Sequence, residues 1–212
     1  SAMNLSNNFS NPRYFIPDPW TQTSSDPSLI SRLLHRSVAQ AVNDNAKSKI
    51  KFKSILGLLY AFAFYTSFKM KIRLTSLAFK ARKKKWFKAI FLDSFLSEIF
   101  LSLQKSRSAD VSVIFLNSLA HLQHHYMHNC NVLRLEKNPN WLLLDDEDPL
   151  LDGIVEMDVI LGNIVELAEK SGANILVATG LTQVPYEKKI FYYRLKEHYK
   201  FFDIFNICYS QI

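Results

Sequence analysis

Histidine is concentrated in one short segment of the chain. Four of the six histidines lie within eight residues, at spacings of three, four and seven: His121, His124, His125 and His128. In a helix these spacings place all four imidazoles on one face. Neutral imidazole is the commonest metal ligand in proteins, so the cluster predicts a metal or anion site, with Asn117 as a further candidate ligand. The alternative is that these histidines face solvent or bond backbone carbonyls in a core.

Hydroxyl and charged side chains elsewhere are candidates for a catalytic role beside such a metal. Asp18 lies between two prolines in a stiff loop, and could complete a coordination sphere or act as a base. Thr21 or Thr179 could supply an attacking hydroxyl, which needs activation because it is weak at its free pKa. Arg194 could hold an anion. A turn-forming role for Asp18 and a surface salt bridge for Arg194 are the plainer alternatives.

Two apolar segments would position this chemistry as strands. Residues 111–116 form a short β-branched run of the kind that a buried parallel strand needs, and residues 174–178 form a second one. The segment from Leu150 to Lys170 between them predicts a helix, with Asp148-Pro149 at its start and Gly172 at its end. A right-handed crossover of this type would bring residues 179–183 beside residues 117–125. The expected fold is α/β, a mostly parallel sheet flanked by helices.

The first half of the chain predicts helices around this core. Residues 4–48 indicate a strand, a loop and a helix that begins at Asp26-Pro27. Residues 49–105 predict an aromatic, lysine-rich helical insertion, with one long helix from Ile50 to Leu77 and another from Trp86 to Leu103. Residues 106–212 would form the α/β core with the histidine cluster. Residues 1–3 have the look of a cloning remnant.

Charge and composition limit the partners. The net charge is +7, and lysine and arginine concentrate between Lys47 and Lys88, which suits an anionic small molecule or glycan, or peripheral contact with a membrane. The basic run 82–85 could equally be a solvated helix face. Nucleic acid is not the expected partner, because no recognition helix, RNA-recognition signature or zinc finger is present. The longest uncharged run, 54–68, is too short for a membrane span, and two cysteines indicate a reducing, cytoplasmic setting.

Three pieces of the sequence resemble phosphodiesterases of the alkaline phosphatase superfamily. LQHHYM at residues 122–127 is similar to a histidine segment of that family, NILVATG at 174–180 is similar to the strand before its second metal loop, and residues 14–29 resemble the loop before its helical cap. The resemblance implies that His124 is a metal ligand. The departures are that no Asp precedes it, that Thr179-Gly180 replaces the family's Asp-His pair, and that the nucleophile strand has no counterpart.

Two functions of different classes follow. The first is a metal-dependent hydrolase or transferase acting on a phosphate or sulfate ester, with cell-surface polysaccharide as one setting and zinc, manganese or calcium as the metal. The second is a non-catalytic binding or assembly domain for an anionic glycan or a protein partner. It would use the same pocket or the aromatic helices between Phe52 and Phe91.

Overall fold

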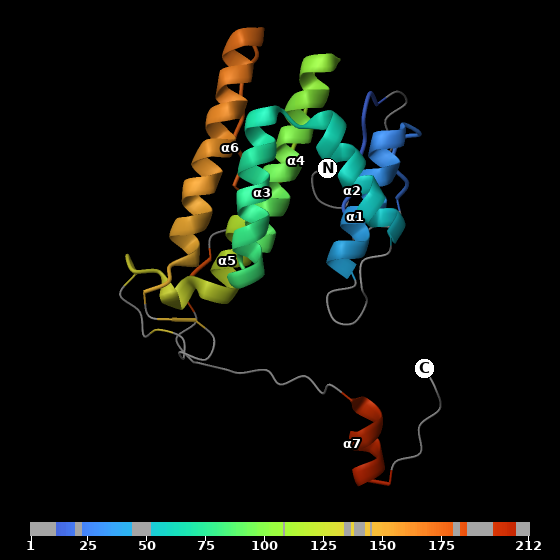
Figure 1. Ribbon diagram of the computed structural model, residues 1–212. Helices are drawn as coiled ribbons and strands as arrows, with labels where there is room; N and C mark the ends of the chain where they lie inside the picture. Colours follow the sequence, from blue (N-terminus) through green and yellow to red (C-terminus); the bar gives the residue numbers. More distant parts are fainter. Residues whose placement is uncertain are drawn as a thin grey trace. The chain divides into compact units, whose positions relative to one another are not determined.

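The described part of the protein is built from helices. The computed structural model describes residues 12–19, 23–43, 52–107, 109–133, 137, 143–144, 146–179, 183–185 and 197–206. In order, the elements are α1 (Leu29–Asn43), α2 (Phe52–Tyr65), α3 (Phe68–Lys83), α4 (Phe87–Ser106), α5 (Ser118–Tyr126), the 3₁₀ turn η1 (Met127–Asn129), α6 (Pro149–Ser171) and α7 (His198–Ile204) (Figure 1). The chain divides into two units, residues 1–181 and residues 182–212.

The predicted α/β fold is wrong for the part of the chain that the structure describes. Residues 112–117 and 173–179 belong to no helix or strand, and apolar side chains in both are exposed, with Val113 at 58% and Leu176 at 91%. A strand is stabilised by its neighbours, and neither segment has a ladder partner among the described residues. The parallel core that the resemblance to alkaline phosphatases implies is therefore not found in them either.

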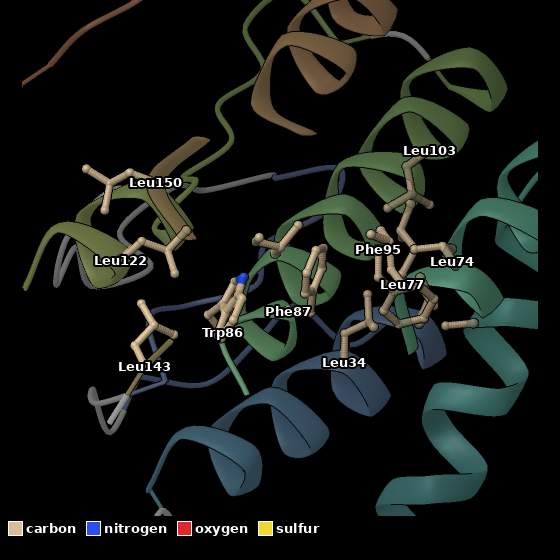
Figure 2. Packing of buried hydrophobic residues seen from close by; sticks show 14 residues of the cluster. Leu34, Leu74, Leu77, Trp86, Phe87, Phe95, Leu103, Leu122, Leu143 and Leu150 are labelled. Carbon is tan, nitrogen blue, oxygen red and sulfur yellow. The ribbon is translucent and has the colours of Figure 1, made fainter. Parts of the chain in front are cut away.

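Helix α4 is the centre of the first unit. It contacts α2, α3, α5 and α6, and Figure 1 shows α3, α4 and α6 running side by side. Most of its buried apolar residues belong to one hydrophobic cluster, which also includes residues of α1, α3, α5 and the start of α6. Figure 2 shows Trp86 and Phe87 between the leucines of the α5–α6 side and the group around Phe95. Burial of this cluster, rather than sheet formation, stabilises the unit.

Local sequence signals set several helix ends as expected. Asp148 caps α6 by accepting a hydrogen bond from the Leu151 N–H at 3.0 Å, and Pro149 occupies the first helical position. Gly172, with a φ of +67°, ends the helix in the left-handed conformation that glycine adopts without strain. The predicted helix from Asp148 to Gly172 is confirmed.

The long helix predicted from Ile50 to Leu77 is in fact two helices. Ser67 breaks it: the Ser67 hydroxyl accepts a hydrogen bond from the Met70 N–H, and the Ser67 N–H donates to the Glu98 carboxylate of α4 at 2.8 Å. α1 and α2 then pack as a pair, while α3 packs along α4. No helix in the described residues is long and apolar enough to cross a membrane, which agrees with the expectation of no spanning segment.

Several polar side chains between the helices are paired. The Arg73 guanidinium of α3 makes two hydrogen bonds to the Glu156 carboxylate of α6, at 2.9 and 2.5 Å, and the Ser94 hydroxyl of α4 donates to the same carboxylate at 2.9 Å. Asp93 of α4 accepts a hydrogen bond from the Ser118 N–H at 2.7 Å, which ties down the start of α5. These contacts fix the register of α3, α5 and α6 on α4.

Candidate functional site

The histidine segment folds into α5 and η1, and it pairs two of the four imidazoles. His121 and His125 lie one helical turn apart, with ring centroids 4.6 Å apart and ring planes at 58°. Partial burial lowers the pKa of both imidazoles, and neighbouring imidazoles lower it further: His125 and His124 act on His121, and His124 acts on His125. Both rings are therefore held in the neutral form, in which imidazole binds metal.

Three of the four histidines, His121, His124 and His125, lie in α5, which ends at Tyr126. His128 lies in the 3₁₀ turn, where the period differs from that of an α-helix. Asn117 stands at the start of α5, where its carbonyl accepts a hydrogen bond from the His121 N–H at 3.0 Å. In the part of the chain that the structure describes, no three His, Cys, Asp or Glu side chains are grouped so as to hold a metal ion.

The remaining predicted site residues lie elsewhere in the chain. Asp18 is partly exposed in the non-helical segment before α1, and Thr179 is exposed at the end of the non-helical stretch 173–179. The sheet edge that was expected to bring Thr179 beside the histidines is not formed among the described residues. Thr21 and Arg194 lie outside the described residues.

Sequence reasoning missed a groove where the N-terminal loop meets α1. Its volume is about 570 Å³, and its polar lining comes from Thr23, Ser24, Ser25 and Asp26 of the loop and from Arg32, His35 and Arg36 of α1. The two arginines lie one helical turn apart, at i and i+4, so both guanidinium groups face the same side. A run of Ser and Thr followed by two arginines at this spacing is a signal that the sequence contains.

Asp26 builds this groove by holding the loop on the helix. Its carboxylate accepts hydrogen bonds from the Phe15 N–H at 2.7 Å and from the Ser28 N–H at 2.9 Å, and its own N–H donates to the Phe15 carbonyl at 3.1 Å. Burial would raise the pKa of Asp26, but its hydrogen bonds, led by that from the Phe15 backbone, outweigh burial and lower the pKa. The ionised carboxylate is thus engaged by backbone donors, and the two arginines leave the groove cationic.

Burial also affects the one histidine in the groove. It lowers the pKa of His35, so that this imidazole is mostly neutral at pH 7 and offers a hydrogen bond rather than a full charge. The positive charge of the groove therefore comes from Arg32 and Arg36. A ligand with a compact negative group at one end fits this lining.

Comparisons with known proteins supply no relative. No protein-family model matches the chain, and no curated protein or solved structure matches it either.

Proposed function

We propose that this chain is a binding domain whose α1 groove holds a phosphate or sulfate group of an anionic ligand such as a glycan. The observation that carries the proposal is that one groove is lined by Arg32, Arg36 and three hydroxyl-bearing residues, while its single carboxylate, Asp26, is engaged by backbone N–H groups. Its volume of about 570 Å³ falls in the usual range of small-molecule sites. The proposal requires no metal, base or nucleophile.

The chemistry of the lining suits an oxyanion. A guanidinium presents parallel N–H donors that match two oxygens of a phosphate or sulfate group, and serine and threonine hydroxyls can donate to the remaining oxygens. The groove runs along α1, and the Asp26 carboxylate already caps the N-terminal end of that helix through the Ser28 N–H. The first turn of α1 contains no acidic residue, and the one carboxylate in the lining, Asp26, is engaged by the Phe15 and Ser28 N–H groups. These features together favour an anion over a neutral sugar.

The test is a calorimetric titration of the purified chain. The ligands are sulfated and phosphorylated saccharides and the same saccharides without the charged groups. We expect binding of the charged compounds only. Hydrogen bonds to a charged group are worth about 1.5–3 kcal/mol each, so Arg32→Gln/Arg36→Gln should weaken binding at least tenfold. The matched control is Arg82→Gln/Lys83→Gln on α3, which removes the same charge elsewhere. Equal binding of neutral and charged saccharides, or equal weakening by both double variants, would refute the proposal.

The metal-dependent ester hydrolase or transferase is a second candidate, and the pairing of His121 with His125 favours it. Two neutral imidazoles one turn apart can chelate a transition metal such as zinc, although a catalytic zinc site usually has three protein ligands. Titration with zinc, manganese and calcium salts tests it. We expect His121→Ala/His125→Ala to abolish zinc uptake and His198→Ala to leave it unchanged. Absence of zinc uptake by the unaltered chain would eliminate this candidate.

A further inference from the structure

The outward face of α3 presents an apolar stripe to solvent. Phe68, Ile72 and Phe79 are 80%, 61% and 62% exposed. At about 100° per residue these three positions fall within roughly 40° of arc. Met70, Leu74 and Leu77 are buried on the opposite side of the helix. The core therefore takes one face of α3 and leaves a second apolar face without a covering element in the described residues.

Cations border this stripe on both sides. On the same wheel, Lys71 and Arg82 flank one edge, and Lys69, Lys80 and Lys83 flank the other. Two of these ammonium groups make local contacts: Lys71 donates to the Ala63 carbonyl at 2.8 Å, and Lys80 lies 5.1 Å from the centroid of the Phe87 ring. Neither the Ala63 carbonyl nor the Phe87 ring carries a negative charge, so these contacts do not neutralise Lys71 or Lys80.

The neighbouring sequence contains no acid to balance this charge, and in space Lys69 is one of the cations that lower the pKa of Glu166 on α6. Between Asp44 and Asp93 the chain has thirteen of its 26 basic residues and none of its 19 acidic ones. Lys69 and Lys71 also lie in the first turn of α3, where a cation opposes the helix dipole. Helix stability therefore does not explain their presence, whereas a negatively charged partner does.

Helix α6 shows that exposed apolar side chains alone do not make such a face. Its exposed residues include Leu161 and Val165, but exposed acidic side chains, Asp158, Glu166 and Glu169, accompany them on the same helix. An anionic surface would repel α6 and attract α3. The two helices thus offer a matched pair, similar in exposed apolar character and opposite in charge.

We propose that the outer face of α3 docks on an anionic lipid bilayer, with the helix lying in the plane of the interface. A helix in that position places aromatic and aliphatic side chains at the boundary of the acyl chains and places lysines beside the phosphate groups. An apolar stripe with a cation border on each side has this arrangement. A soluble polyanion would account for the cations but not for the exposed phenylalanines between them.

The test is co-sedimentation of the full chain with vesicles of phosphatidylcholine alone and of phosphatidylcholine with phosphatidylserine, at low and high salt. We expect binding only to the phosphatidylserine vesicles, and less of it at high salt. Phe68→Ser/Phe79→Ser and Arg82→Glu/Lys83→Glu should each reduce the partition coefficient about tenfold or more. The control Leu161→Ser/Val165→Ser on α6 should leave it unchanged. All six positions are exposed or partly exposed, so circular dichroism should show an intact fold.

Three outcomes would overturn the proposal. The first is equal binding to both kinds of vesicle, which would remove the role of charge. The second is an equal loss of binding in the α3 and α6 variants, which would make the effect unspecific. The third is no vesicle binding together with a dimer that Phe68→Ser/Phe79→Ser dissociates in sedimentation velocity, because the stripe would then contact a second copy of the chain.

Discussion

Two glycines on the same helix provide a test of how α5 packs on α6. Gly153 is buried where α6 meets α5, and a Cβ atom added to it would lie 2.5 Å from Cδ1 of Leu122 and 3.0 Å from Cδ2 of Leu119. Gly162, nine residues further along, has nothing within 4 Å of the same added atom. Alanine at the two positions should therefore change the stability of the protein in opposite directions.

The magnitude follows from two opposing effects. Alanine in place of glycine in a helix interior stabilises by about 0.8–1 kcal/mol, and both variants share this gain. Overpacking a filled core costs roughly 1–3 kcal/mol. Leu122 is fully buried, and 2.5 Å is far inside the ~3.5–4.0 Å at which carbon atoms rest, so the cost should lie in the upper half of that range. We expect Gly153→Ala to be about 1–2 kcal/mol less stable than the original chain and Gly162→Ala about 1 kcal/mol more stable.

Urea unfolding followed by circular dichroism measures the difference. The midpoints should separate while the slopes of the transitions stay equal, since equal slopes indicate that both variants expose the same surface on unfolding. A gap of about 2–3 kcal/mol between the two variants is the expected result. If Gly153→Ala gains as much stability as Gly162→Ala, then Leu122 does not pack against α6 at this point, and the placement of the histidine helix is wrong.

Three further predictions concern ionisable groups. Glu156→Gln leaves the Arg73 guanidinium without its counter-charge. Because Arg73 is partly exposed, we expect the free energy of unfolding in urea to fall by about 1–3 kcal/mol. A second change, Arg73→Met, should restore most of this stability, and no recovery in the double variant would contradict the prediction. Burial raises the pKa of Asp93 in the folded protein above its value in the unfolded chain. Its contribution to stability is therefore complete below the pKa of the unfolded state and is lost as pH rises through the pKa of the folded state. When unfolding is measured against pH, Asp93→Asn should abolish this loss, and an unchanged profile would refute the prediction. The pKa values of His121 and His125 are lowered, so their contribution to the stability of the fold is present above pH 6.5 and is lost on acidification. In NMR titrations both rings should titrate below pH 6.5. His125→Gln should raise the pKa of His121, because it removes a neighbouring imidazole.

The elements that sequence reasoning found correctly are those with local causes. The start of α6 at Asp148-Pro149 and its end at Gly172 depend on residues that contact one another within a single turn. The break between α2 and α3 has a distant cause, since the Ser67 N–H bonds to Glu98 of α4, 31 residues away. A pattern of apolar spacing contains no information about such a contact, so the sequence predicted one uninterrupted helix.

The predicted strands show the same limit more strongly. The β-branched run at 111–116 lies outside any helix, as a strand preference requires, but it forms no strand. A sheet, however, is made by the partner strand, and neither this run nor residues 173–179 pairs with one among the described residues. The inferred crossover assumed that two apolar runs on either side of a helix must pair with each other. That assumption, rather than the local pattern, produced the wrong fold class.

The two candidate sites also differ in whether their cause is local or distant in the sequence. Spacing along one helix placed His121 beside His125, and the structure confirms that the two rings are in contact. The groove on α1 depends on Asp26 bonding Phe15 eleven residues earlier, which brings the serine-rich loop onto the helix. Arg32 and Arg36 acquire a shared role only after that contact has formed. Their spacing could have been noticed in the sequence, but the groove could not.

The groove on α1 and the stripe on α3 share one feature of the sequence, which is that basic residues greatly outnumber acidic ones in this part of the chain. Between Pro27 and Leu92 the only acidic residue is Asp44, so both surfaces lie in a strongly cationic half. Salt should nevertheless distinguish them. At physiological ionic strength the Debye length is about 8 Å, which screens the attraction of an exposed lysine for a lipid surface, while the hydrogen bonds of a guanidinium in a groove act at contact and are screened much less. Raising the salt concentration should therefore release vesicles from α3 before it releases a sulfated saccharide from α1, and simultaneous release would mean that both surfaces attract anions through net charge alone.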